Sequence, residues 1–108
     1  MKGYVYLLCD WGKDGAYKIG VTRGKIENRI KELQTGNSGE IVMCSYYPSD
    51  YPFFIEKTLH QRYGNNKLLN EWFALDNDEA LKFKDRCKEV ENMIDALKDN
   101  PFFGKNLK

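Results

Sequence analysis

The sequence predicts an α+β fold in which a small antiparallel three-stranded sheet is flanked by helices. Three observations predict it: short runs of aromatic and aliphatic residues, turn residues between those runs, and apolar residues at helical spacing farther along the chain. The expected order is β-β-α-β-α-(β)-α, in which the bracketed strand is short. The chain has 108 residues, of which 42% are hydrophobic and 31% charged, as expected for one globular domain.

The first two strands are expected at residues 4–9 and 16–22, where aromatic and aliphatic side chains dominate. Residues 10–15 between them are rich in glycine and aspartate, which favours a turn, so the two strands should form a hairpin. Gly20 lies inside the second strand, where glycine is unfavourable. Its position indicates that another group approaches the backbone closely there.

A helix is expected over residues 25–34, because Ile26, Ile30 and Leu33 would share one face, and a third strand is expected over 41–47. Ser49 or Asp50 would cap the next helix, which has Pro52 in its first turn and runs to about residue 63. An extended piece at 71–75 precedes a long helix from about 77 to 97. This last helix is expected to face the core with Leu81, Val90, Met93, Ile94 and Leu97.

The formal net charge of +1 excludes a protein that coats nucleic acid through bulk positive charge. Any nucleic-acid binding must therefore use local charge. Residues 17–35 supply it with Lys18, Arg23, Lys25, Arg29 and Lys31.

Other features bear on the location of the protein. No apolar run approaches the ~18 residues that a membrane helix needs, and the N-terminus does not resemble a signal peptide. Cys9, Cys44 and Cys87 form no Cys-x-x-Cys pair, so they indicate neither a zinc site nor a redox motif. Cys9 and Cys44 lie in apolar runs and are expected to be buried, reduced thiols. We therefore expect a cytoplasmic protein that does not bind a membrane.

Several polar residues are expected at the boundary of the core. Arg29 borders the apolar stripe of its helix, and Glu56 and His60 lie one turn apart beside buried positions. Lys18 interrupts an otherwise apolar strand. Each also has an ordinary structural explanation. Arg29 would extend to solvent or pair with Glu32, Glu56 and His60 would form a pair on a helix surface, and Lys18 would lie on an exposed strand face.

Together these residues resemble the GIY-YIG nuclease superfamily, in its small stand-alone branch from phages and bacteria. Residues 3–6, Gly-Tyr-Val-Tyr, are similar to the G-I-Y element, and residues 17–20, Tyr-Lys-Ile-Gly, to the Y-I-G element. Arg29 and Glu56 occupy positions where the family has an arginine and a metal-binding glutamate. The resemblance covers about residues 3–85. One departure is Lys18, which stands where the family has its second tyrosine.

The resemblance implies a metal-dependent endonuclease that hydrolyses phosphodiester bonds, in DNA rather than RNA. Tyr6 would be the general base, Arg29 would hold the scissile phosphate, and Glu56 would bind Mg²⁺ or Mn²⁺. His60 would assist the water or the leaving group, or position Glu56, and Glu71 would brace the site. The expected catalytic residues are Tyr6, Tyr17, Lys18, Arg29 and His60, and the expected nucleic-acid-binding residues are Arg23, Lys25 and Lys31.

The expected nuclease domain spans residues 1–85. Residues 86–108, the rest of the last helix and a basic tail, would pack on the same domain. Many relatives join this module to a separate DNA-binding domain, and none is evident here, so a targeting partner protein or a homodimer is an open expectation. The alternative function is a catalytically inactive nucleic-acid- or protein-binding module on the same fold, which the small net charge favours.

Overall fold

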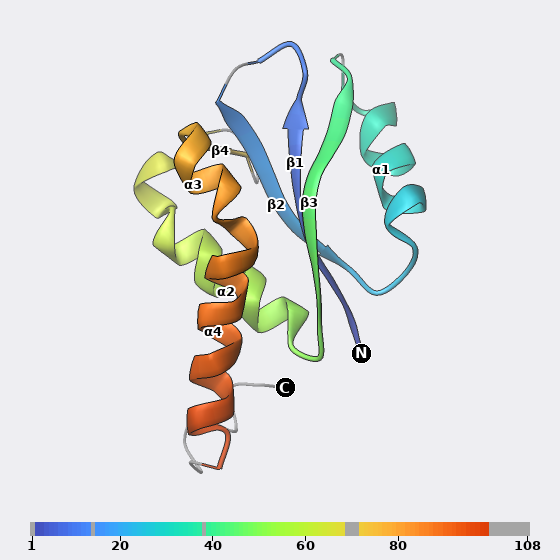
Figure 1. The fold of residues 1–108 in the computed structure, drawn as a ribbon. Coiled ribbons are helices and arrows are strands. Elements are labelled where there is room, and N and C mark those ends of the chain that lie inside the picture. Colours follow the sequence, from blue (N-terminus) through green and yellow to red (C-terminus); the bar gives the residue numbers. More distant parts are fainter. Residues whose placement is uncertain (1, 14, 38, 69–71, 100–108) are drawn as a thin grey trace.

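The computed structural model describes residues 2–13, 15–37, 39–68 and 72–99. It confirms the α+β class and the predicted order of elements (Figure 1). The expectations for Glu71 and for the basic tail lie outside the described residues. In chain order the elements are β1 Gly3–Asp10, β2 Ala16–Thr22, α1 Ile26–Thr35, β3 Ile41–Ser49, α2 Pro52–Arg62, η1 Gly64–Asn66, β4 Trp72–Ala74, α3 Asn77–Leu81 and α4 Phe83–Leu97.

The described sheet has four antiparallel strands in the order β3-β1-β2-β4, one more than the three expected. The short extended piece that the sequence indicated is β4, which pairs with Ala16, Tyr17 and Lys18 at the start of β2. Beyond Lys18, α2 packs along β2. The strand that carries the Y-I-G-like element is therefore bordered by β1 on one side and by β4 and α2 on the other.

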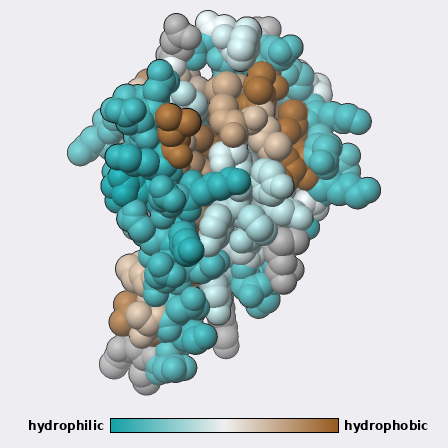
Figure 2. All heavy atoms as spheres, viewed as in Figure 1, coloured by the Kyte–Doolittle hydropathy of each residue, from teal (hydrophilic) through white to brown (hydrophobic). Residues whose placement is uncertain are grey.

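The two faces of the sheet are covered by different helices. Val5, Leu7 and Ile19 pack with buried residues of α2 and α4, whereas Tyr6 and Leu8 pack with Ile41 and with partly buried side chains of α1. Figure 1 shows α2 and α4 side by side, with α1 apart from them beside β3. In Figure 2 the outward surfaces of α2 and α4 are mainly hydrophilic, and hydrophobic residues are visible over the strands. Alternate residues of β1 thus serve different environments.

The prediction of one long helix over 77–97 was wrong, because this segment forms two helices. The break changes which side chains face the core. α3 ends at Leu81 and α4 begins at Phe83. Leu81 is 84% exposed, whereas Phe83 and Cys87 join the core instead. Val90 and Ile94 are buried as expected; Met93 and Leu97 remain 39% and 40% exposed.

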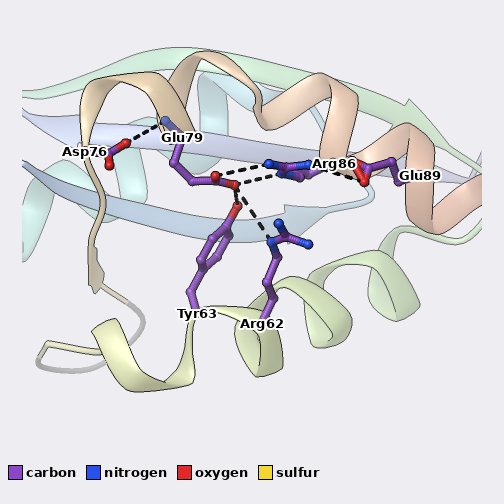
Figure 3. A network of polar contacts seen from close by, with 6 residues as sticks. All are labelled: Arg62, Tyr63, Asp76, Glu79, Arg86 and Glu89. Carbon is purple, nitrogen blue, oxygen red and sulfur yellow. Dashed lines mark hydrogen bonds and ion pairs between the residues drawn. The ribbon is translucent and has the colours of Figure 1, made fainter.

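A polar network around Glu79 holds the α3–α4 bend against the end of α2 (Figure 3). Glu79 accepts a hydrogen bond from Tyr63 and two from Arg86, at 2.9 and 3.3 Å, and Arg62 lies 3.9 Å away. The hydrogen bond from Arg86 is the main cause that lowers the pKa of Glu79 to about 2. Asp76 caps α3 by accepting from the Glu79 backbone N–H at 2.8 Å. The bend therefore brings carboxylate and guanidinium groups of neighbouring helices together.

Two further expectations need correction. The N-cap of α2 is Tyr51 rather than Ser49 or Asp50, although the Ser49 hydroxyl accepts a hydrogen bond from the Tyr51 backbone N–H at 2.9 Å. Cys44 is exposed and Cys9 is only partly buried. The reason for Cys44 is an irregularity in β3, where the partners of Leu7 and Leu8 jump from Ser45 to Met43 and leave Cys44 unpaired in the ladder.

Among the described residues, no helix is both long enough and apolar enough to cross a membrane.

Candidate active site

The centre of the site is the side chain of Tyr6, which lies over Gly20. The two residues are partners across β1 and β2, and Tyr6 is only 1% exposed. A Cβ atom added to Gly20 would lie 2.7 Å from Tyr6 Cε1 and closer still to the hydroxyl. Only glycine leaves room for this ring, which explains the glycine inside the strand.

Arg29 reaches this tyrosine from α1. Its Nε donates a hydrogen bond to Tyr6 Oη at 3.2 Å, and its Nη1 donates to Glu32 Oε2 at 3.1 Å. The contact with Tyr6 is the main cause that raises the pKa of Arg29 above its ordinary value. The side chain nevertheless stays 38% exposed. The guanidinium is therefore oriented by two acceptors and still open to an anion from solvent.

A surface cavity of about 330 Å³ borders Arg29 between the end of β2 and the start of α1. Thr22 and Asn28 line it, although the sequence analysis did not identify them as site residues. The signal that could have indicated Asn28 is its position directly before Arg29. The full lining is Val21, Thr22, Gly24, Lys25, Asn28, Arg29 and Glu32.

His60 fastens α2 to the outer edge of β2. Its Nε2 lies 2.8 Å from the carbonyl oxygen of Ile19, and its ring packs on Phe73 at a centroid distance of 5.0 Å. Because a carbonyl only accepts hydrogen bonds, Nε2 must carry the proton and donate it. Only Nδ1 then remains for other chemistry. Among the roles expected for His60, this geometry favours the positioning of Glu56, which lies on the same helix.

The path of α2 along β2 places Glu56 near the level of Gly20. At one end, a Cβ on Gly3 would lie 3.1 Å from Pro52 Cγ and 2.8 Å from the Thr22 carbonyl oxygen, so the start of α2 is close to the end of β2. At the other end, His60 contacts Ile19. Glu56 lies midway between Pro52 and His60 and is partly buried. At about 1.5 Å per helical residue and 3.3 Å per strand residue, the midpoint falls beside residues 20 and 21.

Lys18 lies on the same face of β2 as Gly20 and so faces the same side of the sheet as Tyr6. It is 7% exposed, and its Nζ lies 6.0 Å from the ring centroid of Trp72 in β4. A buried ammonium group is favourable near an aromatic face. The lysine that interrupts the apolar strand is thus held beside the site by the fourth strand.

The remaining predicted residues are Tyr17, Arg23, Lys25 and Lys31. Tyr17 is on the opposite face of β2, where its hydroxyl donates to Asn77 Oδ1 at 3.4 Å, so the structure does not bring it together with Tyr6. Arg23 stacks its guanidinium on the Phe53 ring at 4.9 Å. Lys25 is the N-cap of α1, and Lys31 is exposed on the same helix.

The resemblance assigns the implied metal to the carboxylate of Glu56. Among the described residues, no three or more His, Cys, Asp or Glu side chains cluster as metal ligands. Mg²⁺ commonly binds through one or two carboxylates and completes its shell with water and substrate phosphate oxygens. Glu56 alone therefore fits a site of this kind.

One protein-family model matches most of the chain. A search of curated proteins and a search of solved structures returned no match. The model of the T5orf172 domain matches residues 3–88, which include β1, β2, α1 and α2 with all the residues described above. This domain is related to the GIY-YIG nuclease-like families, which supports the coarser part of the resemblance. The chain belongs to the T5orf172 domain family.

Proposed function

We propose that this chain is a metal-dependent endonuclease that hydrolyses phosphodiester bonds in DNA. The observation that carries the proposal is the hydrogen bond from Arg29 to Tyr6, at 3.2 Å, formed over Gly20. It brings the G-I-Y-like strand, the Y-I-G-like strand and the arginine helix to one point. By its position between Pro52 and His60 on α2, Glu56 lies at about the level of Gly20, which supports its inclusion in the site.

Arg29 is the residue that would bind the scissile phosphate. Tyr6 and Glu32 fix the orientation of its guanidinium before substrate arrives, so little reorganisation is needed during the reaction. Its partial exposure leaves room for a phosphate at the adjoining cavity. Charge-assisted hydrogen bonds from arginine to phosphate are among the stronger polar contacts in proteins.

Tyr6 would take the proton of the attacking water. The hydrogen bond that it accepts from the Arg29 guanidinium favours its phenolate form, which is the form a general base requires. The tyrosine is 1% exposed, so this proton transfer would occur in a buried environment rather than in bulk solvent. Lys18, buried on the same face, adds positive charge that also favours the phenolate.

Glu56 would hold Mg²⁺ or Mn²⁺, and the bound cation would stabilise negative charge on the phosphate and the leaving oxygen. His60 acts on Glu56 through the backbone, because its hydrogen bond to Ile19 fixes the position of α2 on β2. His60 is therefore a positioning residue in this proposal. Lys25, at the edge of the Arg29 cavity, would contact the phosphate backbone.

The proposal is tested by nicking of supercoiled plasmid DNA with Mg²⁺ or Mn²⁺. The wild-type protein should nick the plasmid, and Glu56→Ala should abolish nicking without loss of the folded circular-dichroism spectrum. Glu40→Ala, which removes an exposed carboxylate elsewhere on the chain, is the matched control and should nick normally. Nicking by Glu56→Ala at the wild-type rate would contradict the assignment of Glu56.

One observation favours the binding-only alternative. The ion pair of Arg29 with Glu32 partly neutralises the group that should bind phosphate. If no divalent cation supports cleavage of DNA or RNA, yet gel-shift experiments show a nucleic-acid complex that Arg29→Ala weakens, the function is binding without cleavage.

A further inference from the structure

A second cavity lies by the N-terminal end of α1, where β1 and β3 meet the loop that follows β2. Its volume is about 570 Å³. Tyr4 and Tyr46 form one wall, with their rings in an edge-to-face arrangement at a centroid distance of 5.8 Å. Tyr46 is 40% exposed and Met43 is 39% exposed. The lining residues are Tyr4, Arg23, Gly24, Lys25, Ile26, Glu27, Met43 and Tyr46.

Basic residues also line this cavity. Arg23 and Lys25 contribute cationic side chains, against one carboxylate from Glu27. A third cation approaches from α4, where Lys84 Nζ lies 5.6 Å from the centroid of the Tyr46 ring. An exposed aromatic ring next to basic side chains is complementary to a nucleotide, because the ring can stack on the base while the cations attract the phosphate.

The position of the cavity connects it to the candidate active site. Tyr4 is two residues from Tyr6 on the same face of β1, a spacing of about 6–7 Å, and Tyr46 is the β3 partner of Tyr6. Arg29 follows Ile26 by about one turn of α1. Lys25 lines both cavities. If a nucleic-acid strand binds with one phosphate at Arg29, a neighbouring base would therefore lie next to Tyr46.

We propose that this cavity binds one unstacked base next to the phosphate held by Arg29, so that the preferred substrate is single-stranded or locally unpaired nucleic acid. The proposal rests on the proposed function for the class of substrate. In an intact duplex both faces of a base are already stacked on their neighbours, and the base must leave that stack before its face can meet an aromatic side chain. In this proposal, Tyr46 is the residue that makes the protein prefer single-stranded over duplex nucleic acid.

The test measures binding without cleavage. Each variant carries Glu56→Ala and is studied in EDTA by fluorescence anisotropy, with a labelled oligothymidylate of about a dozen nucleotides and a duplex of the same length as probes. Stacking of one base changes affinity roughly 5- to 150-fold, so Tyr46→Ala should weaken single-strand binding by about tenfold. Duplex affinity should change less than about twofold, because the ring contributes nothing to duplex binding in this proposal.

Two further variants complete the experiment. Tyr46→Phe keeps the ring and should retain most of the single-strand affinity. Trp11→Ala removes a more exposed aromatic residue, 73% exposed, from the turn at the other end of β1 and is the matched control that should bind normally. The proposal is overturned if Tyr46→Ala binds the single strand as its parent does, if it loses duplex and single-strand affinity equally, or if the parent binds neither probe. An unchanged affinity would leave a protein partner as the ligand of this surface.

Failure of this proposal is distinguishable from failure of the proposed function. A protein that nicks plasmid DNA but shows no effect of Tyr46→Ala would retain the nuclease and lose the base site. A protein that cleaves nothing but binds single strands through Tyr46 would retain the base site and lose the nuclease.

Discussion

Replacing Gly20 with alanine should destabilise the protein because the new methyl group would occupy the space of the Tyr6 ring. The added Cβ would lie 2.5 Å from Tyr6 Cζ and 2.7 Å from Cε1, about 1 Å inside ordinary van der Waals contact. Tyr6 cannot easily move away, since it is 1% exposed and bonded to Arg29. Overpacking of this kind typically costs about 1–3 kcal/mol in the free energy of unfolding.

A double-mutant cycle isolates the cause of that loss. In a Tyr6→Leu background the ring is absent, so Gly20→Ala should cost less than about 0.5 kcal/mol. It could even stabilise, because alanine is favoured over glycine inside a strand by about 0.5–1 kcal/mol. Gly36→Ala is the matched control, because nothing lies within 4 Å of a Cβ at Gly36, and it should change stability by no more than about 0.5 kcal/mol.

Urea denaturation followed by circular dichroism gives the four unfolding free energies of the cycle and the control. The reasoning is refuted if Gly20→Ala costs no more than Gly36→Ala, or if its cost is the same with and without the Tyr6 ring.

The other predictions concern charge. Glu79, whose pKa is lowered to about 2 from an ordinary value of 4.5, should contribute up to about 3 kcal/mol above pH 4.5 and lose this contribution as the pH falls toward 2. Glu79→Gln should therefore lower the free energy of unfolding at pH 7, measured in urea, and should remove most of that pH dependence; an unchanged pH profile would contradict the role of the network. Arg29→Lys keeps the charge but loses the Nε donor to Tyr6. It should reduce the nicking rate about 10²- to 10³-fold while the protein stays folded, and a rate within about threefold of wild type would argue against a phosphate-binding guanidinium.

Local patterns were enough to predict most of the fold. Runs of aromatic and aliphatic residues located β1, β2 and β3, and Pro52 marked the first turn of α2 correctly. Gly20 even indicated a close approach before the approaching ring was known. These signals are encoded by neighbouring residues, which is why sequence alone carries them.

Features that depend on distant contacts were missed. The break between α3 and α4 lies beside the contacts of Glu79 with Tyr63 and Arg86, and no local pattern predicts the contact with Tyr63. The exposure of Cys44 follows from an irregular pairing between β3 and β1. At the candidate site, the interaction of Lys18 with Trp72 depends on the pairing of β4 with β2, which the sequence did not predict.

The most direct test of the proposed nuclease site is a crystal structure of the protein soaked with Mn²⁺ and a short oligothymidylate, with anomalous diffraction to locate the metal. We expect an anomalous peak at the carboxylate of Glu56, with a phosphate between that metal and the guanidinium of Arg29. No peak at Glu56, or a phosphate bound away from Arg29, would contradict the proposal that these residues form one catalytic centre.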